Sequence, residues 1–103
     1  MASRTQIDEI VHKIVATCHP SKVILFGSHA YGQPDENSDV DLLIVAESDL
    51  PRYKRGREIR KCLRGSKMAV DLLVYTPGEI EKWKDVKTSF ITTVMEKGIV
   101  LYG

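Results

Sequence analysis

The stretch that decides the fold spans residues 22–46 and reads KVILFGSHAYGQPDENSDVDLLIVA. It opens with an apolar run over 22–26, which predicts a buried strand because the run is short and a glycine follows it. A second apolar run over 40–46 predicts another strand. The polar segment 33–38, with its proline and asparagine, predicts a loop between the strands. Residues 27–32 predict a turn or a single helical turn.

The sequence outside this stretch predicts helices and two further strands. Before it, apolar residues recur at helical spacing until His19-Pro20 ends the pattern. After it, a capping box at Thr76–Glu79 marks the start of a helix. The predicted elements are helices over 5–18, about 49–64, from 76 onward and about 88–97, and strands over 68–75 and 99–102. Strands alternating with helices predict an α/β (α+β) fold with one sheet.

Length and composition exclude several classes of protein. The 103 residues are 43% hydrophobic, which predicts one folded domain over residues 1–103 and argues against global disorder. The longest apolar runs are too short to span a membrane, and the N-terminus lacks a basic-then-apolar leader, so we expect a cytoplasmic protein. Cys18 and Cys62 have neither metal nor redox spacing and are predicted to be reduced thiols.

The charge is divided between the two halves of the chain. The net charge is only +1, but residues 1–50 carry 3 basic and 8 acidic side chains, whereas residues 51–103 carry 12 basic and 6 acidic ones. Eight of those basic residues lie in the basic segment, Arg52–Lys67, with Glu58 as its only acid. Such a division suggests a polar ligand or partner.

Three interpretations of the basic segment are open. It is a solvated helix face, or one or two of its residues contact a triphosphate, or it is a docking surface for an acidic partner or RNA. The triphosphate candidates are Arg52, Lys54, Arg55 and Arg57. Tyr53 is the only aromatic residue in the segment, so base stacking has little support, and nucleic acid is not favoured as a partner.

The pair Asp39 and Asp41 is the most informative feature for function. Side chains alternate along a strand, so both carboxylates are expected on one face and the intervening Val40 on the other. Two adjacent carboxylates repel each other unless a cation lies between them, and Mg²⁺ prefers such oxygen ligands. The alternative is a solvated strand start in an acidic loop, because a D-x-D pair is short and recurs by accident.

Two further features fit the same chemistry. Gly27-Ser28 follows a strand and opens a helical turn, where unpaired backbone N–H groups favour phosphate. The alternative is an ordinary turn. Asp71 lies within an apolar strand, which is costly unless the carboxylate is paired or bound to metal. The alternative is a salt bridge at the sheet edge. A phosphate cradle, two metal-binding acids and a third acid together suit nucleotidyl transfer.

The combined spacing resembles a known family. Gly27-Ser28, Gly32 and the segment Ser38-Asp39-Val40-Asp41-Leu42 are similar to the G-S-x-x-x-G-x(5)-S-D-x-D-L signature of the DNA polymerase beta-like nucleotidyltransferase superfamily. The chain looks most like the minimal nucleotidyltransferases, which are typically prokaryotic. The resemblance implies the nucleotidyltransferase fold, with a small mixed β-sheet flanked by helices.

The resemblance also implies site residues and a function. Gly27 and Ser28 would hold the β- and γ-phosphates of ATP, Asp39 and Asp41 would ligate two Mg²⁺ ions, and Asp71 would be the third catalytic and metal-binding carboxylate. Minimal nucleotidyltransferases often serve as antitoxins that transfer AMP to a tyrosine of a HEPN-domain toxin. The alternatives are a non-catalytic antitoxin that neutralises its partner by binding alone, and a transferase that acts on a small-molecule hydroxyl.

Overall fold

The computed structural model describes residues 3–34, 39–65 and 68–103. Ser38 of the signature and Lys67 of the basic segment lie outside the described residues, as does most of the predicted loop over 33–38. The helices are α1 (Arg4–Cys18), α2 (Ser28–Tyr31), the 3₁₀ turn η1 (Arg52–Lys54), α3 (Arg57–Cys62), α4 (Pro77–Trp83) and α5 (Phe90–Lys97). The strands are β1 (Lys22–Phe26), β2 (Val40–Val45), β3 (Val70–Tyr75) and β4 (Ile99–Tyr102).

The four strands form one mixed sheet in the order β3-β2-β1-β4. β1 lies antiparallel to both of its neighbours, β2 and β4. β2 and β3 run parallel, because the chain crosses from one to the other through η1 and α3. The predicted small mixed sheet flanked by helices is therefore confirmed.

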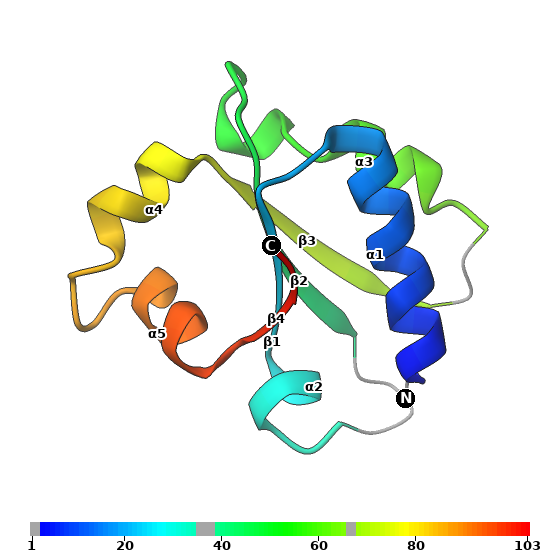
Figure 1. Ribbon diagram of the computed structural model, residues 1–103, viewed down its shortest axis with the longest axis horizontal. Helices are drawn as coiled ribbons and strands as arrows, with labels where there is room; N and C mark the ends of the chain where they lie inside the picture. The colour runs from blue at the N-terminus through cyan, green and yellow to red at the C-terminus, as the bar shows by residue number, and fades with distance from the viewer. Residues whose placement is uncertain (1–2, 35–38, 66–67) are drawn as a thin grey trace.

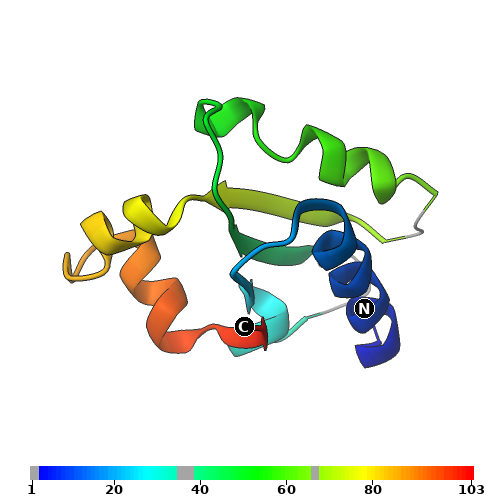
Figure 2. The ribbon, with the colours of Figure 1, turned by 45° about the horizontal axis from the view of Figure 1, so that its top comes forward.

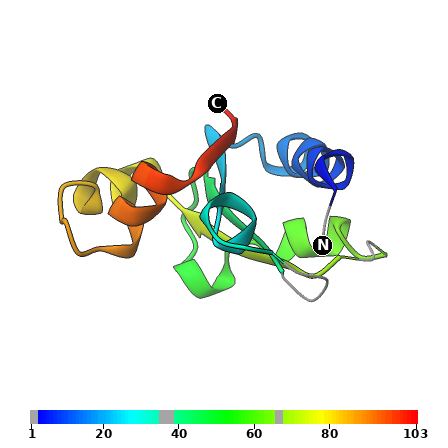
Figure 3. The same ribbon diagram turned by 90° about the horizontal axis from the view of Figure 1, so that it is seen from below.

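Helices cover both faces of this sheet. α1 and α3 lie on one side and α4 and α5 on the other (Figures 1 and 3). Because side chains alternate along each strand, the core forms two clusters, one on each face of the sheet. Val23 and Leu25 pack in the cluster that includes α1, whereas Ile24 packs in the cluster that includes α5. The central strands are therefore apolar on both faces, which explains their continuous hydrophobic runs.

The predicted helix over 49–64 is wrong in its extent. Pro51 is extended, η1 makes a single 3₁₀ turn, and Gly56 has φ +84, which interrupts the helical path before α3 begins at Arg57. A left-handed glycine is a helix boundary and does not fit a helix interior. α1 begins one residue before the predicted start at residue 5, because Ser3 forms a capping box with Gln6. The Thr76–Glu79 capping box is confirmed.

One buried hydroxyl joins α4 to α5. Thr92 is 7% exposed, and its Oγ1 lies 2.6 Å from the carbonyl oxygen of Val86 and 3.1 Å from those of Trp83 and Lys84. It also lies 2.9 Å from the hydroxyl of Ser89, the residue that caps α5. The single hydroxyl hydrogen can be donated to only one of these oxygens at a time, and the hydroxyl thereby links the end of α4 to the start of α5.

We expect Thr92→Val to lower the free energy of unfolding by about 1–3 kcal/mol, because it removes the buried hydroxyl that hydrogen-bonds the end of α4 to the start of α5. Chemical denaturation measures the change. Thr93→Val is the matched control, since the Thr93 hydroxyl makes a single long contact of 3.4 Å to Ser89. Equal losses for the two variants would contradict a special role for Thr92.

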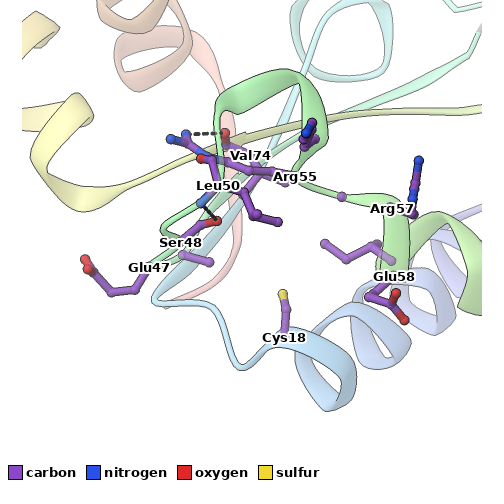
Figure 4. A pocket seen from close by; sticks show the side chains of 12 residues that line it. Cys18, Glu47, Ser48, Leu50, Arg55, Arg57, Glu58 and Val74 are labelled. Carbon is purple, nitrogen blue, oxygen red and sulfur yellow. Dashed lines mark hydrogen bonds between the residues drawn. The ribbon is translucent and has the colours of Figure 1, made fainter.

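Arg55 is a structural residue. Its guanidinium donates to the carbonyl oxygens of Leu50 (2.8 Å) and Val74 (3.2 Å) and to the carboxylate of Glu79, and only 9% of its side chain is exposed. Figure 4 shows its contacts with the 46–50 segment and β3. The suggestion that Arg55 contacts a triphosphate is corrected: its donors already hold η1 to β3 and α4.

The Arg55–Glu79 pair makes stability depend on pH. The hydrogen bond from Arg55 lowers the pKa of Glu79, with a further contribution from the backbone N–H of Thr76. A carboxylate whose pKa is depressed in the fold stabilises it above its unfolded pKa, and that contribution is lost as pH falls through the folded pKa. We expect Glu79→Gln to reduce stability at neutral pH and to flatten the acid limb of a urea-unfolding series between about pH 7 and about pH 3. An unchanged acid limb would contradict this linkage.

None of the helices in the described ranges combines the length and the apolar character needed to cross a membrane.

Candidate active site

Parallel pairing of β2 and β3 places two carboxylates side by side. Asp41 and Asp71 are direct register partners at the start of the two strands. Side chains on adjacent strands in register are about 5 Å apart and point to the same face. That face is the one covered in part by α4 and α5. Leu43 lies two residues after Asp41 and so on the same face of β2, and it packs in the core cluster that includes Ile91 and Val94 of α5. Val40 and Leu42 are buried on the opposite face, as the alternation predicts.

The three predicted acids differ in exposure. Asp41 is half-buried, whereas Asp39 and Asp71 are exposed. Asp39 directly precedes β2 and is two residues from Asp41, so the structure places all three carboxylates at one corner of the sheet. Among the described residues, however, no three His, Cys, Asp or Glu side chains are already arranged around a metal position. The ligands would therefore have to draw together around an ion.

The electrostatics of this corner favour a cation. Burial raises the pKa of Asp41, and the neighbouring Asp71 and Asp39 carboxylates raise that pKa further, while His29 lowers it. The like charges repel, and a divalent cation between them would relieve the repulsion. Carboxylate oxygens are also the donors that Mg²⁺ prefers, so these residues fit the metal that the family implies.

Gly27 brings the turn after β1 against Asp41. Its backbone has φ +74 and ψ −154, a conformation almost confined to glycine. A Cβ atom at this position would overlap the Oδ2 atom of Asp41. Because Phe26 is the register partner of Asp41, the end of β1 lies directly beside the acids. Glycine is therefore required here both for its backbone and for the space it leaves.

The helical turn that follows is tightly closed. The N–H groups of Ala30 and Tyr31 both donate to the carbonyl oxygen of Gly27, at 3.0 and 3.1 Å. A Cβ atom on Gly32 would lie 2.8 Å from the Cα atom of Ser28, so the second glycine of the signature allows the chain to pass close to the serine. The G-S-x-x-x-G spacing is therefore explained by the close approach of Gly32 to Ser28. The resulting turn presents Ser28 beside the carboxylates, where phosphate oxygens can accept hydrogen bonds.

Two features of this corner escaped the sequence analysis. His29 acts electrostatically on Asp41, although its position in the sequence gave no partner for it. Phe26 and Phe90 meet edge to face, with ring centroids 5.2 Å apart and planes at 81°, so an aromatic pair borders the acids. The register of β1 with β2 brings Phe26 there, and no short sequence pattern indicates that register.

The basic residues lie away from this corner. The guanidinium of Arg52 lies 4.7 Å from the ring centroid of Tyr75, which is four residues beyond Asp71 on β3. Four residues of strand correspond to about 13 Å. Arg52 is therefore at the opposite end of the strand from the carboxylates. Arg57 is on α3, which covers the other face of the sheet (Figure 2).

A pocket of about 380 Å³ lies between the 46–50 segment and the start of α3 (Figure 4). Cys18 points into it, and burial raises the pKa of the Cys18 thiol, with a smaller effect from Cys62. Both cysteines are free thiols, as predicted. The lining includes Ile59 and Val74, which also pack in the core cluster on the α1 side of the sheet, and neither the Gly27-Ser28 turn nor any of the three predicted acids. This pocket is therefore separate from the carboxylates.

A family model for the nucleotidyltransferase domain matches residues 5–101. The chain belongs to the nucleotidyltransferase domain family. Two relatives from Methanocaldococcus jannaschii each carry the name "putative protein adenylyltransferase". One is 40% identical over 78 residues, which are 76% of this chain and 75% of the relative. The other is 37% identical over 82 residues, which are 79% of this chain and 77% of the relative. The predicted enzyme class, a nucleotidyltransferase, is confirmed.

Solved structures show the same fold. A structure from Sulfolobus solfataricus described as a "putative nucleotidyltransferase" has a TM-score of 0.64 and 23% identity, and the match covers 93% of this nucleotidyltransferase and 76% of that chain. A structure titled as a toxin–antitoxin with AMP-PNP has a TM-score of 0.62 and 22% identity, covering 93% and 73%. At this identity the likeness shows the fold, and it agrees with the predicted resemblance to minimal nucleotidyltransferases.

Proposed function

We propose that this nucleotidyltransferase transfers AMP from ATP to a hydroxyl group of a partner protein, in a reaction that requires Mg²⁺. The observation that carries the proposal is the pairing of Asp41 with Asp71 on adjacent strands, with the Gly27 turn packed against Asp41. The names of the two archaeal relatives support a protein acceptor. The description of one structural neighbour as a toxin–antitoxin supports an antitoxin role. The resemblance to minimal nucleotidyltransferases implies a HEPN-type toxin as the partner and one of its tyrosines as the acceptor.

The residues divide the work of the reaction. Gly27 and Ser28 would hold the β- and γ-phosphates, with the Ser28 hydroxyl as one of the donors. Asp39, Asp41 and Asp71 would hold two Mg²⁺ ions, which when bound neutralise developing charge and lower the pKa of the attacking hydroxyl. The hydroxyl oxygen bonds to the α-phosphorus, and the bond from that phosphorus to the bridging oxygen breaks. Pyrophosphate leaves, and the hydroxyl proton passes to a carboxylate, for which Asp71 is the candidate.

ATP labelled at the α-phosphate tests the proposal in the presence of the partner protein. We expect label on a tyrosine of the partner, which mass spectrometry locates. Addition of EDTA should stop the transfer, and an excess of Mg²⁺ should restore it. Label that appears with ATP labelled only at the γ-phosphate would contradict nucleotidyl transfer.

A second experiment separates catalysis from neutralisation by binding alone. The Asp39→Asn/Asp41→Asn double variant keeps the shape of the site but removes both negative charges. We expect it to bind the partner and to fail to protect cells from it. Full protection by this variant would exclude the enzymatic account of neutralisation.

A further inference from the structure

A groove with a strongly positive lining lies on the outer side of α3 and η1. It has a volume of about 660 Å³, and we call it the basic groove. Its lining residues are Tyr53, Lys54, Arg57, Arg60, Lys61 and Arg64. Five of the six are cations, and no acidic residue in the described part of the chain lines the groove. Like charges this close repel one another unless an anion is present, which points to an anionic ligand.

Neighbouring acids neutralise little of this charge. Lys61 lies 3.4 Å from Glu58, but both side chains are more than half exposed, so the pair is weak. Glu58 itself lines the other pocket of α3, on the side of Cys18. The groove therefore keeps most of its positive potential.

The groove is also held in shape by hydrogen bonds. Arg60 donates to the carbonyl oxygen of Leu72 on β3 (3.3 Å) and to that of Arg55 (3.4 Å), which fixes α3 against the edge of the sheet. Arg57 and Lys61 are four residues apart on α3 and so share one face of the helix, and Arg64 lines the same groove from the turn that follows α3. A row of cations at this spacing suits a chain of phosphates better than a single one.

Tyr53 supplies a second kind of contact. Its side chain is 80% exposed at the mouth of the groove, with the Lys54 ammonium 5.8 Å from the ring centroid. A large exposed aromatic ring beside a cationic track is the arrangement that stacks an unpaired base. Along the sequence a single tyrosine gave little support for stacking, and the structure changes this by placing that tyrosine beside the row of cations.

We propose that the basic groove binds single-stranded nucleic acid, with phosphates on the α3 cations and a base on Tyr53. An acidic peptide is the competing ligand, but a peptide groove needs apolar anchors, and Tyr53 is the only aromatic or aliphatic side chain among the described residues that line the groove. α3 packs with α1 on the face of the sheet opposite Asp41, so the groove is separate from the site of AMP transfer (Figures 1 and 2).

Fluorescence anisotropy with a labelled 12-nucleotide oligo(U) RNA tests this proposal. We expect Arg57→Gln/Lys61→Gln/Arg64→Gln to weaken binding at least tenfold near physiological salt. The salt dependence should also fall: removing three phosphate contacts lowers the slope of log affinity against log salt by about 2. Tyr53→Ala should weaken binding roughly tenfold, and Tyr53→Phe should bind as the wild type does.

Matched controls separate the groove from overall charge and from the carboxylate site. Lys13→Gln/Lys82→Gln/Lys87→Gln removes the same number of exposed cations elsewhere and should bind normally. Asp39→Asn/Asp41→Asn should also bind normally, since those residues lie on the other face. Oligo(dU) of the same length distinguishes RNA from DNA, and binding of either supports the proposal.

Several outcomes would overturn it. One is an equal loss of affinity in the two triple variants, because the groove would then contribute only net charge. Another is tighter binding of a poly-glutamate peptide than of oligo(U), which would make the groove a docking site for an acidic protein. Equal affinity for double-stranded RNA of the same length would contradict stacking on Tyr53.

Discussion

Asp41→Ala is expected to lower the rate of AMP transfer by at least about three orders of magnitude, because Asp41 is the carboxylate that touches both other parts of the site. It is the register partner of Asp71 and lies against Gly27. Its loss removes a metal ligand and breaks the link between the carboxylates and the phosphate-binding turn. Initial rates with ATP labelled at the α-phosphate and saturating partner measure the effect.

Asp49→Ala is the control for that experiment. Asp49 is an exposed carboxylate in the loop after β2, so its removal changes net charge equally without touching the site. We expect near wild-type transfer from it. Asp41 also carries the only raised carboxyl pKa resolved in the described chain, which means that its ionised form is less favourable in the fold than in the unfolded chain. Removal of this carboxylate should therefore not destabilise the fold. An Asp41→Ala protein that folds and transfers AMP at the wild-type rate would refute the assignment of the site.

Gly27→Ala is expected to lower transfer by about 100-fold or more and to cost about 1–3 kcal/mol of folding free energy. The stability loss comes from the backbone, which at φ +74 disfavours any side chain. The activity loss comes from the added Cβ, which would displace the Asp41 carboxylate. Urea unfolding measures the first effect and AMP transfer the second.

Gly65→Ala separates these two effects. Gly65 also has a positive φ, +91, but a Cβ there would have no neighbour within 4 Å. We therefore expect a similar loss of stability with unchanged transfer. If Gly27→Ala and Gly65→Ala reduced activity alike, backbone strain would explain both, and the contact of Gly27 with Asp41 would have no catalytic importance.

Local patterns predicted most of the secondary structure because they depend on neighbouring residues. The capping box at Thr76–Glu79 and the apolar runs of β1 and β2 are examples. The helix over 49–64 was mispredicted because its composition suits a helix, while Gly56 adopts a left-handed backbone between η1 and α3. The role of Arg55 was hidden for a related reason, since its partners Val74 and Glu79 are 19 and 24 residues away.

The sequence by itself determined the family, the glycine–serine turn and the D-x-D pair, because these rest on spacing within one short stretch. The tertiary structure decided what stands beside them. It placed Asp71 next to Asp41 through the parallel register of β2 and β3, and Phe26 beside them through β1. It also gathered basic residues of η1, α3 and the turn after α3 into one groove. Strand register and helix packing join residues far apart in the chain, and therefore only the folded molecule shows which charges meet.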